Sequence, residues 1–261
     1  MLSKLLKHEF KATARLLLPL YLVLFVLTIV ERVAISLNLK GSLEIIPGFS
    51  TFAYFLSIIA IAVVSCVIII LRFYKNLMTD EGYLMFTLPV NPQQLINSKL
   101  LVSFVWIVVS VVFIIVSLFG AFITKERFDL FIDGFRMLYT QMKHEFGVVN
   151  MNLFLIEFIV LMILGIINNI LVIYASIAIG QLFNGHKVLG SFAAYIGIST
   201  VLQIIVTISF VILGVLFNKS FEEINALPQI IFPLTIVYTL LTNILFYFVT
   251  NYIFKKKLNL E

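Results

Sequence analysis

The sequence predicts an all-α integral membrane protein with six transmembrane helices. Hydrophobic residues make up 62% of the 261 residues and charged residues only 12%. The mean hydropathy of +1.13 is higher than a surface exposed to water tolerates. Apolar runs without charge recur along the chain, most of them longer than the roughly 20 residues that cross a bilayer core of about 30 Å. We therefore expect residues 1–261 to form a single transmembrane domain.

The charged residues on either side of each apolar run delimit the predicted spans. These spans cover residues 16–37, 51–73, 99–123, 154–180, 190–217 and 231–254. The first is the least regular, because Arg15 and Glu31 enclose too few residues to cross the bilayer. We extend it to Leu37 and place Glu31 and Arg32 near the far interface, where long side chains reach the headgroups. A cleaved secretory signal is the alternative, but no A-x-A cleavage pattern follows, so we expect a retained span.

The distribution of basic residues predicts the orientation. Cytoplasmic connections are enriched in lysine and arginine. With the N-terminus inside, the inner segments hold most of the 18 basic residues, namely Lys4, Lys7, Lys11, Arg15, Arg72, Lys75, Lys99, Lys187, Lys255, Lys256 and Lys257. Both termini are therefore predicted to be cytoplasmic, in a multi-pass protein of the cell membrane. The net charge of +5 then reflects topology and membrane contact, and we expect no nucleic-acid partner.

Two connecting segments have an amphipathic helical pattern. Residues 1–15 alternate apolar and basic positions at helical spacing, which predicts an interfacial helix, either a lipid anchor or a docking element. Residues 125–146 carry an apolar stripe opposite charged residues, which predicts an extracellular amphipathic segment. A simple lid and a substrate-sensing element are both compatible with that pattern.

The cytosolic segment 74–98, between the second and third spans, is the most informative part of the sequence. It presents Tyr83 and Phe86 among polar residues, Pro89 ends its short helix, and Gln93 begins a helix leading into the third span. Aromatic side chains in an inner loop favour a protein partner, although burial among lipid headgroups explains them equally well.

Catalytic and metal-binding patterns are missing from the sequence. There is no G-x-x-x-x-G-K-[ST] loop to hold nucleotide phosphates, and the three histidines do not form a ligand motif. The single cysteine, Cys66, excludes an internal disulfide. We expect no catalytic residue, no metal site and no cofactor in this chain.

Polar residues within the late spans are the candidates for a translocation path. They are Glu157, Asn168, Asn169, Gln203 and Asn243. For the amides the simpler expectation is interhelical hydrogen bonding, worth about 1 kcal/mol each. Glu157 lies about one turn inside the outer end of its span, where it either makes a structural hydrogen bond or relays protons.

A longer motif in the cytosolic segment carries a family resemblance. The motif consists of Asp80, Glu81, Gly82, Tyr83, Leu84, Met85, Phe86, Thr87, Leu88, Pro89 and Val90, followed by Ser98, Lys99 and Leu100. It resembles the E-G-Y-L-x-x-T-L-P and S-K-L pattern of the six-helix permease subunits of bacterial type-2 ABC exporters. The resemblance implies a coupling helix at about residues 75–90 that docks on a separate ATP-binding subunit, which holds the ATP and Mg²⁺. The implied contact residues are Asp80, Glu81, Gly82, Tyr83, Leu84, Phe86, Leu88 and Pro89.

The resulting functional expectation is a permease subunit that moves an amphiphilic substrate outward, with amphipathic or antimicrobial peptides as the favoured class. A second permease, either a copy or a paralogue, would complete the complex. The alternative is an ion- or proton-coupled secondary transporter that uses Glu157. An intramembrane enzyme is a third class, but paired catalytic groups at mid-span are missing.

Overall fold

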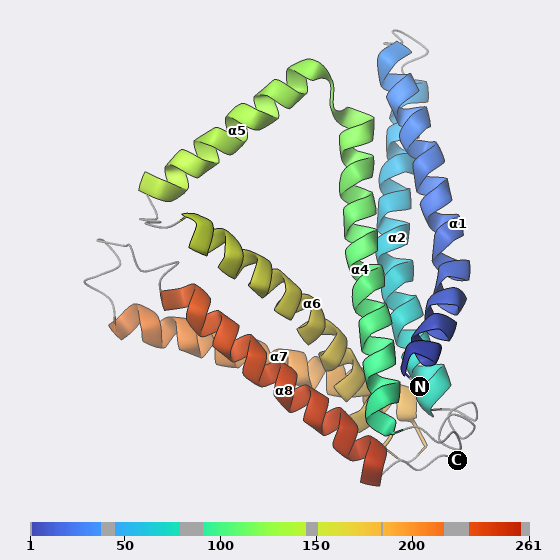
Figure 1. Ribbon diagram of the computed structural model, residues 1–261, viewed down its shortest axis with the longest axis vertical. Coiled ribbons are helices and arrows are strands. Elements are labelled where there is room, and N and C mark those ends of the chain that lie inside the picture. Colours follow the sequence, from blue (N-terminus) through green and yellow to red (C-terminus); the bar gives the residue numbers. More distant parts are fainter. Residues whose placement is uncertain are drawn as a thin grey trace. The chain divides into compact units, whose positions relative to one another are not determined.

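The computed structural model describes residues 2–37, 45–78, 91–144, 151–183, 185–216 and 230–256, and these form helices without any strand. The helices are α1 (Leu2–Leu37), α2 (Ile45–Met78), α4 (Pro92–Phe122), α5 (Lys125–His144), α6 (Met151–Gly180), α7 (Lys187–Leu216) and α8 (Phe232–Lys256) (Figure 1). All of these except α5 are long and apolar enough to cross a membrane. The predicted all-helical fold with six apolar helices is therefore confirmed for the described residues.

Several helix boundaries differ from the predicted ones. α1 runs without interruption from Leu2 to Leu37, so the structure has no helix end at residue 15 between the predicted interfacial helix and the first span. α4 begins at Pro92, which suits the first helical position because proline has no N–H to leave unpaired there. The predicted helix in the segment 125–146 is present as α5, whose described side chains are exposed except for the half-buried Ile132 and Met142.

The chain divides into two compact units. Unit 1 comprises residues 1–73 and 94–131 and contains α1 and most of α2 and α4. Unit 2 comprises residues 74–93 and 132–261 and contains α6, α7 and α8.

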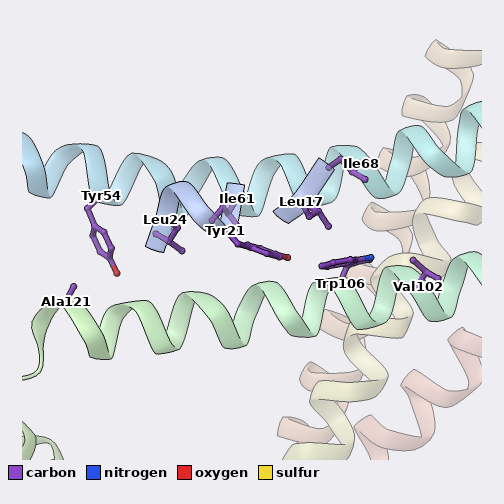
Figure 2. Close-up of a cluster of buried hydrophobic side chains, with 9 residues drawn as sticks. All are labelled: Leu17, Tyr21, Leu24, Tyr54, Ile61, Ile68, Val102, Trp106 and Ala121. Atoms are coloured by element: carbon purple, nitrogen blue, oxygen red, sulfur yellow. The ribbon is translucent and has the colours of Figure 1, made fainter. Parts of the chain in front are cut away.

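In unit 1, α1, α2 and α4 pack around a shared apolar core (Figure 2). The core consists of Leu17, Tyr21, Leu24, Tyr54, Ile61, Ile68, Val102, Trp106 and Ala121. From Glu9 to Leu24 of α1 the buried positions recur every three or four residues, as expected for one face of a helix. Large apolar side chains on the other faces are exposed, which suits a lipid environment.

Hydroxyl groups on α4 join all three helices of unit 1 at two levels. Ser110 Oγ lies 2.7 Å from Tyr21 Oη of α1 and 3.2 Å from Ser65 Oγ of α2. Two helical turns further along, Ser117 Oγ lies 2.7 Å from both Thr28 Oγ1 of α1 and Tyr54 Oη of α2. Interhelical hydrogen bonds of this kind stabilise helix association in lipid, where the hydrophobic effect contributes little.

Glu31 does not point outward as we expected from the sequence. It is only 1% exposed, and its carboxylate accepts hydrogen bonds of 2.7 Å from Ser50 and Thr51 of α2. These bonds satisfy a buried acid within the bundle, so Glu31 ties α1 to α2 at the end opposite to Glu9. Arg32, its neighbour, is exposed and donates to the Ile123 carbonyl at 2.6 Å.

In unit 2, α6 packs against both α7 and α8. The connection from α6 to α7 is short and includes Gly185, whose φ of 89° favours glycine. At Gly180 the two helices approach so closely that a Cβ would come 2.5 Å from the backbone nitrogen of Ser191. α6 and α8 run in parallel, because Phe154 stacks on Phe232 near their first residues and Asn168 contacts Thr242 further along.

Candidate functional site

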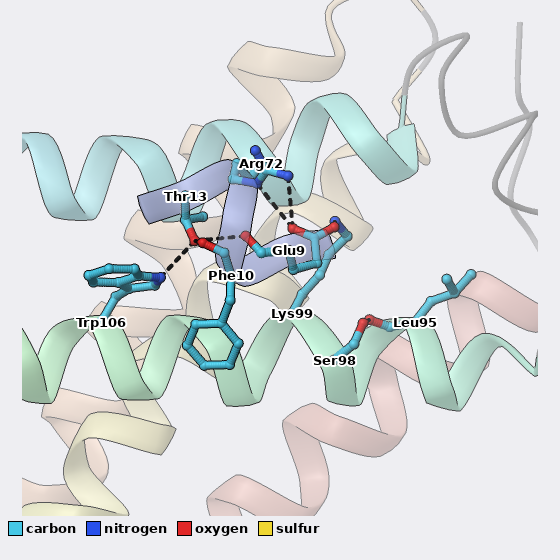
Figure 3. A network of polar contacts seen from close by, with 8 residues as sticks. All are labelled: Glu9, Phe10, Thr13, Arg72, Leu95, Ser98, Lys99 and Trp106. Atoms are coloured by element: carbon cyan, nitrogen blue, oxygen red, sulfur yellow. Dashed lines mark hydrogen bonds and ion pairs between the residues drawn. The ribbon is translucent and has the colours of Figure 1, made fainter. Parts of the chain in front are cut away.

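One acidic and two basic side chains, each from a different helix of unit 1, form a charged cluster (Figure 3). Glu9 of α1 accepts a hydrogen bond of 2.8 Å from Lys99 Nζ of α4 through its Oε1 atom. Its Oε2 atom lies 3.0 Å from both Nε and Nη2 of Arg72 of α2. We call these three residues the Glu9 cluster.

The Glu9 cluster is largely shielded from solvent. The side chains of Lys99 and Glu9 are 4% and 8% exposed, whereas that of Arg72 is 24% exposed. Charges in such surroundings are tolerated when they are paired and hydrogen-bonded, and removing one partner leaves the other without compensation. The Glu9–Lys99 pair is therefore the energetically critical part of the cluster.

The backbone of α1 at Glu9 is also linked to α4. Thr13 Oγ1 donates to the Glu9 carbonyl at 2.8 Å and in turn accepts a hydrogen bond of 2.6 Å from Trp106 Nε1. Phe10 packs beside this indole, with ring centroids 6.3 Å apart. The same turn of α1 is thus tied to α4 both through a carboxylate and through a hydroxyl (Figure 3).

The Glu9 cluster lies close to both ends of the predicted coupling segment. Arg72 is about two helical turns before Met78, where α2 ends, and Lys99 is about two turns after Pro92, where α4 begins. Residues 79–91 connect α2 to α4 along the chain, and Glu9 therefore joins the same two helices through its side chain.

The predicted contacts for the ATP-binding subunit fall within that connection. Asp80, Glu81, Gly82, Tyr83, Leu84, Phe86, Leu88 and Pro89 lie outside the described residues. The described parts of the segment 74–98 are its two ends, which are helical as the last turn of α2 and the first turns of α4. The predicted helix start near Gln93 is confirmed.

In unit 2, two of the predicted polar residues bind each other. Asn168 Nδ2 of α6 donates to Asn243 Oδ1 of α8 at 3.0 Å and to Thr242 Oγ1 at 2.8 Å. Asn243 is 7% exposed and returns a hydrogen bond of 3.2 Å from Nδ2 to the Leu164 carbonyl. The predicted interhelical hydrogen bonding is confirmed for this pair, which forms a polar seam between α6 and α8.

Three further polar groups of α6 and α8 are buried without a hydrogen-bond partner in the described part of the chain. They are Oε2 of Glu157, the hydroxyl of Tyr238 and Oδ1 of Asn251. Glu157 shares the inward-facing positions of α6 with Phe154, Leu161 and Asn168, and as a residue it is half-buried. A carboxylate oxygen without a partner at this depth is a candidate for binding a proton, a cation or a polar group of a substrate.

The other two candidates for the path do not join the seam. Asn169 is exposed and donates to the Gly165 carbonyl of its own helix at 3.0 Å. Gln203 is exposed on α7. Among the five candidates, the structure brings together only Asn168 and Asn243.

The sequence reasoning missed Glu9 as a structural residue. The amphipathic pattern of residues 1–15 contrasts apolar with basic positions and assigns no role to Glu9. The signal was its position: Leu2, Leu6, Glu9 and Thr13 recur at helical spacing, which places the carboxylate on the packed face.

The six long apolar helices of the described residues define the chain as a helical, multi-pass membrane protein. Comparison with protein-family models, with curated proteins and with solved structures finds no match to it.

Proposed function

We propose that this chain is the membrane permease subunit of an ATP-driven exporter. Its energy comes from a separate ATP-binding subunit, which holds ATP and Mg²⁺ and docks on the cytosolic segment 74–98. Two permeases, identical or paralogous, enclose the path for an amphiphilic substrate, with amphipathic or antimicrobial peptides as the favoured class. Both termini lie in the cytoplasm, in keeping with the distribution of basic residues.

The observation that carries the proposal is the Glu9 cluster. A docking segment transmits movement only if the helices at its two ends move together. Arg72 and Lys99 fix those two helices to one carboxylate of α1, within about two turns of the segment. The two levels of hydroxyl contacts at Ser110 and Ser117 extend the same coupling along the helices.

The mechanism that follows is mechanical. When ATP draws the partner subunits together, they displace the segment that bears Tyr83 and Phe86. α2 and α4 cannot respond independently, because α1 joins them through the Glu9 cluster. The displacement is therefore delivered to unit 1 as a whole. This is a rigid-body transition of the kind by which small local shifts become large domain movements.

Docking is tested by replacing both aromatic side chains, Tyr83→Ala with Phe86→Ala. We expect the doubly substituted chain to insert and fold, to lose co-purification with the ATP-binding subunit, and to lose transport-stimulated ATP hydrolysis. Phe128→Ala with Phe135→Ala in α5 is the matched control, because it removes two exposed aromatic rings outside the segment 74–98. Normal binding and stimulation by the Tyr83 and Phe86 variant would refute the docking assignment.

Uncoupling is tested at Glu9. We expect Glu9→Gln to retain the ATP-binding subunit, because the docking residues are untouched, and to hydrolyse ATP with reduced transport per ATP. Unchanged transport per ATP, in a variant whose Glu9 cluster is shown to be weakened, would remove the mechanical role of the cluster.

Glu157 favours a second candidate function, an ion- or proton-coupled secondary transporter. The specific observation is its buried Oε2 atom, which has no hydrogen-bond partner among the described residues. The test is Glu157→Gln, measured as transport across a range of pH. Unchanged transport would exclude Glu157 as the coupling residue, whereas loss of gradient-driven transport would favour this candidate over the ATP-driven exporter.

A further inference from the structure

An open cavity with basic walls lies at the charged end of unit 1. It is lined by His8, Lys11, Ala12, Arg15, Leu16 and Arg72, and has a volume of about 490 Å³. That volume lies within the range of roughly 300–1,000 Å³ that is typical of small-molecule sites. Five of the lining residues belong to α1 and follow one face of the helix, while Arg72 comes from α2.

The charged side chains that line the cavity are all basic. Lys11, Arg15 and Arg72 carry permanent cationic groups at neutral pH, and the His8 imidazole adds a hydrogen-bonding nitrogen. The nearest acid described is Glu9, which is held by Arg72 and Lys99 together. Glu9 therefore cancels only part of the surrounding positive charge.

We expect the cavity to lie at the depth of the lipid headgroups, next to the start of the first apolar run. The first charge-free run of the sequence extends from Leu16 to Val30, and the basic residues of the cavity immediately precede it. Leu16, which is 51% exposed, and Ala12 give the cavity an apolar side next to that run. A ligand that fits this arrangement has an anionic head and an apolar tail.

We infer that this cavity binds the phosphate headgroup of an anionic membrane phospholipid. Arginine and lysine are the usual ligands of phosphate oxygens, arginine because its guanidinium group donates two parallel hydrogen bonds. The apolar side of the cavity distinguishes a lipid phosphate from a soluble one. The bound headgroup would contact Arg72, which also pairs with Glu9. The inference does not depend on the proposed exporter function.

The test measures lipid retention by the purified full-length chain. The chain is transferred to detergent micelles containing either phosphatidylglycerol or phosphatidylcholine, and bound lipid is counted by native mass spectrometry. We expect selective retention of phosphatidylglycerol. Lys11→Gln with Arg15→Gln should lower its affinity on the order of tenfold or more. Lys4→Gln with Lys7→Gln is the matched control, because it removes the same charge from exposed positions of α1 outside the cavity.

The comparison between the two double variants decides the inference. Retention that falls only in the Lys11 and Arg15 variant supports a defined headgroup site. An equal loss in both variants would show diffuse attraction to the basic N-terminal half of α1 and overturn it, as would no loss in either. Displacement of the lipid by millimolar inorganic phosphate, together with thermal stabilisation of the protein by phosphate equal to that by the lipid, would also overturn it in favour of a soluble ligand.

Discussion

Breaking the Glu9–Lys99 pair should destabilise unit 1 far more than breaking the Glu9–Arg72 pair. Lys99 Nζ lies 2.8 Å from Glu9 Oε1, and both side chains are less than a tenth exposed. Removing one partner of such a buried pair costs about 3–5 kcal/mol, whereas removing both costs much less. Arg72 is 24% exposed, so water screens its interaction and lowers the expected coupling to about 1 kcal/mol.

The assay is a double-mutant cycle on reversible unfolding in mixed micelles. The variants are Glu9→Gln, Lys99→Gln, Arg72→Gln and the two double combinations with Glu9→Gln. Fluorescence of Trp106, the only tryptophan of the chain, reports on unit 1 directly because its indole donates to Thr13 beside Glu9. We expect the Glu9–Lys99 coupling energy to exceed the Glu9–Arg72 coupling energy by about 2 kcal/mol. Additive effects of Glu9→Gln and Lys99→Gln, or a larger coupling to Arg72, would refute the reasoning.

Two further predictions concern unit 2. Asn168→Leu should lower the free energy of unfolding by about 1 kcal/mol because it removes the hydrogen bonds to α8, including the one to Asn243, whereas Asn169→Leu should have little effect. Unfolding in mixed micelles measures both, and equal losses would contradict the assigned seam. Gly180→Ala should reduce thermal stability and folded yield, because its Cβ would collide with the backbone of α7. Gly197→Ala, which meets nothing within 4 Å, is the control, and equal behaviour of the two variants would show that the close approach at Gly180 is unimportant.

The number and approximate position of the apolar helices could be predicted from the sequence. The hydrophobic period of lipid-exposed helices is weak, but their length and lack of charge are unmistakable, and these two properties depend only on local composition. The boundary placed after Arg15 is absent from the structure for a physical reason. Basic side chains on one face of α1 do not interrupt backbone hydrogen bonding, so the helix continues into the apolar run.

The polar contacts were predictable only in part. Asn168 and Asn243 stood out as amides in apolar runs that need partners, and the structure pairs them. Glu31 and Glu9 did not, because each lies beside basic residues and suggests a solvated interface. Their burial depends on which face of α1 is oriented toward the bundle, and packing against α2 and α4 determines that orientation. Which helices pair is a property of the tertiary structure, and the composition of each segment does not predict it.

The measurement that tests the central claim most directly is uphill transport in reconstituted vesicles. The chain is incorporated alone or together with the proposed ATP-binding subunit, and accumulation of a fluorescent amphipathic peptide is followed. We predict accumulation only when both subunits and ATP are present, and none by the chain alone under an imposed sodium or proton gradient. Gradient-driven accumulation by the chain alone would contradict the account and favour a secondary transporter.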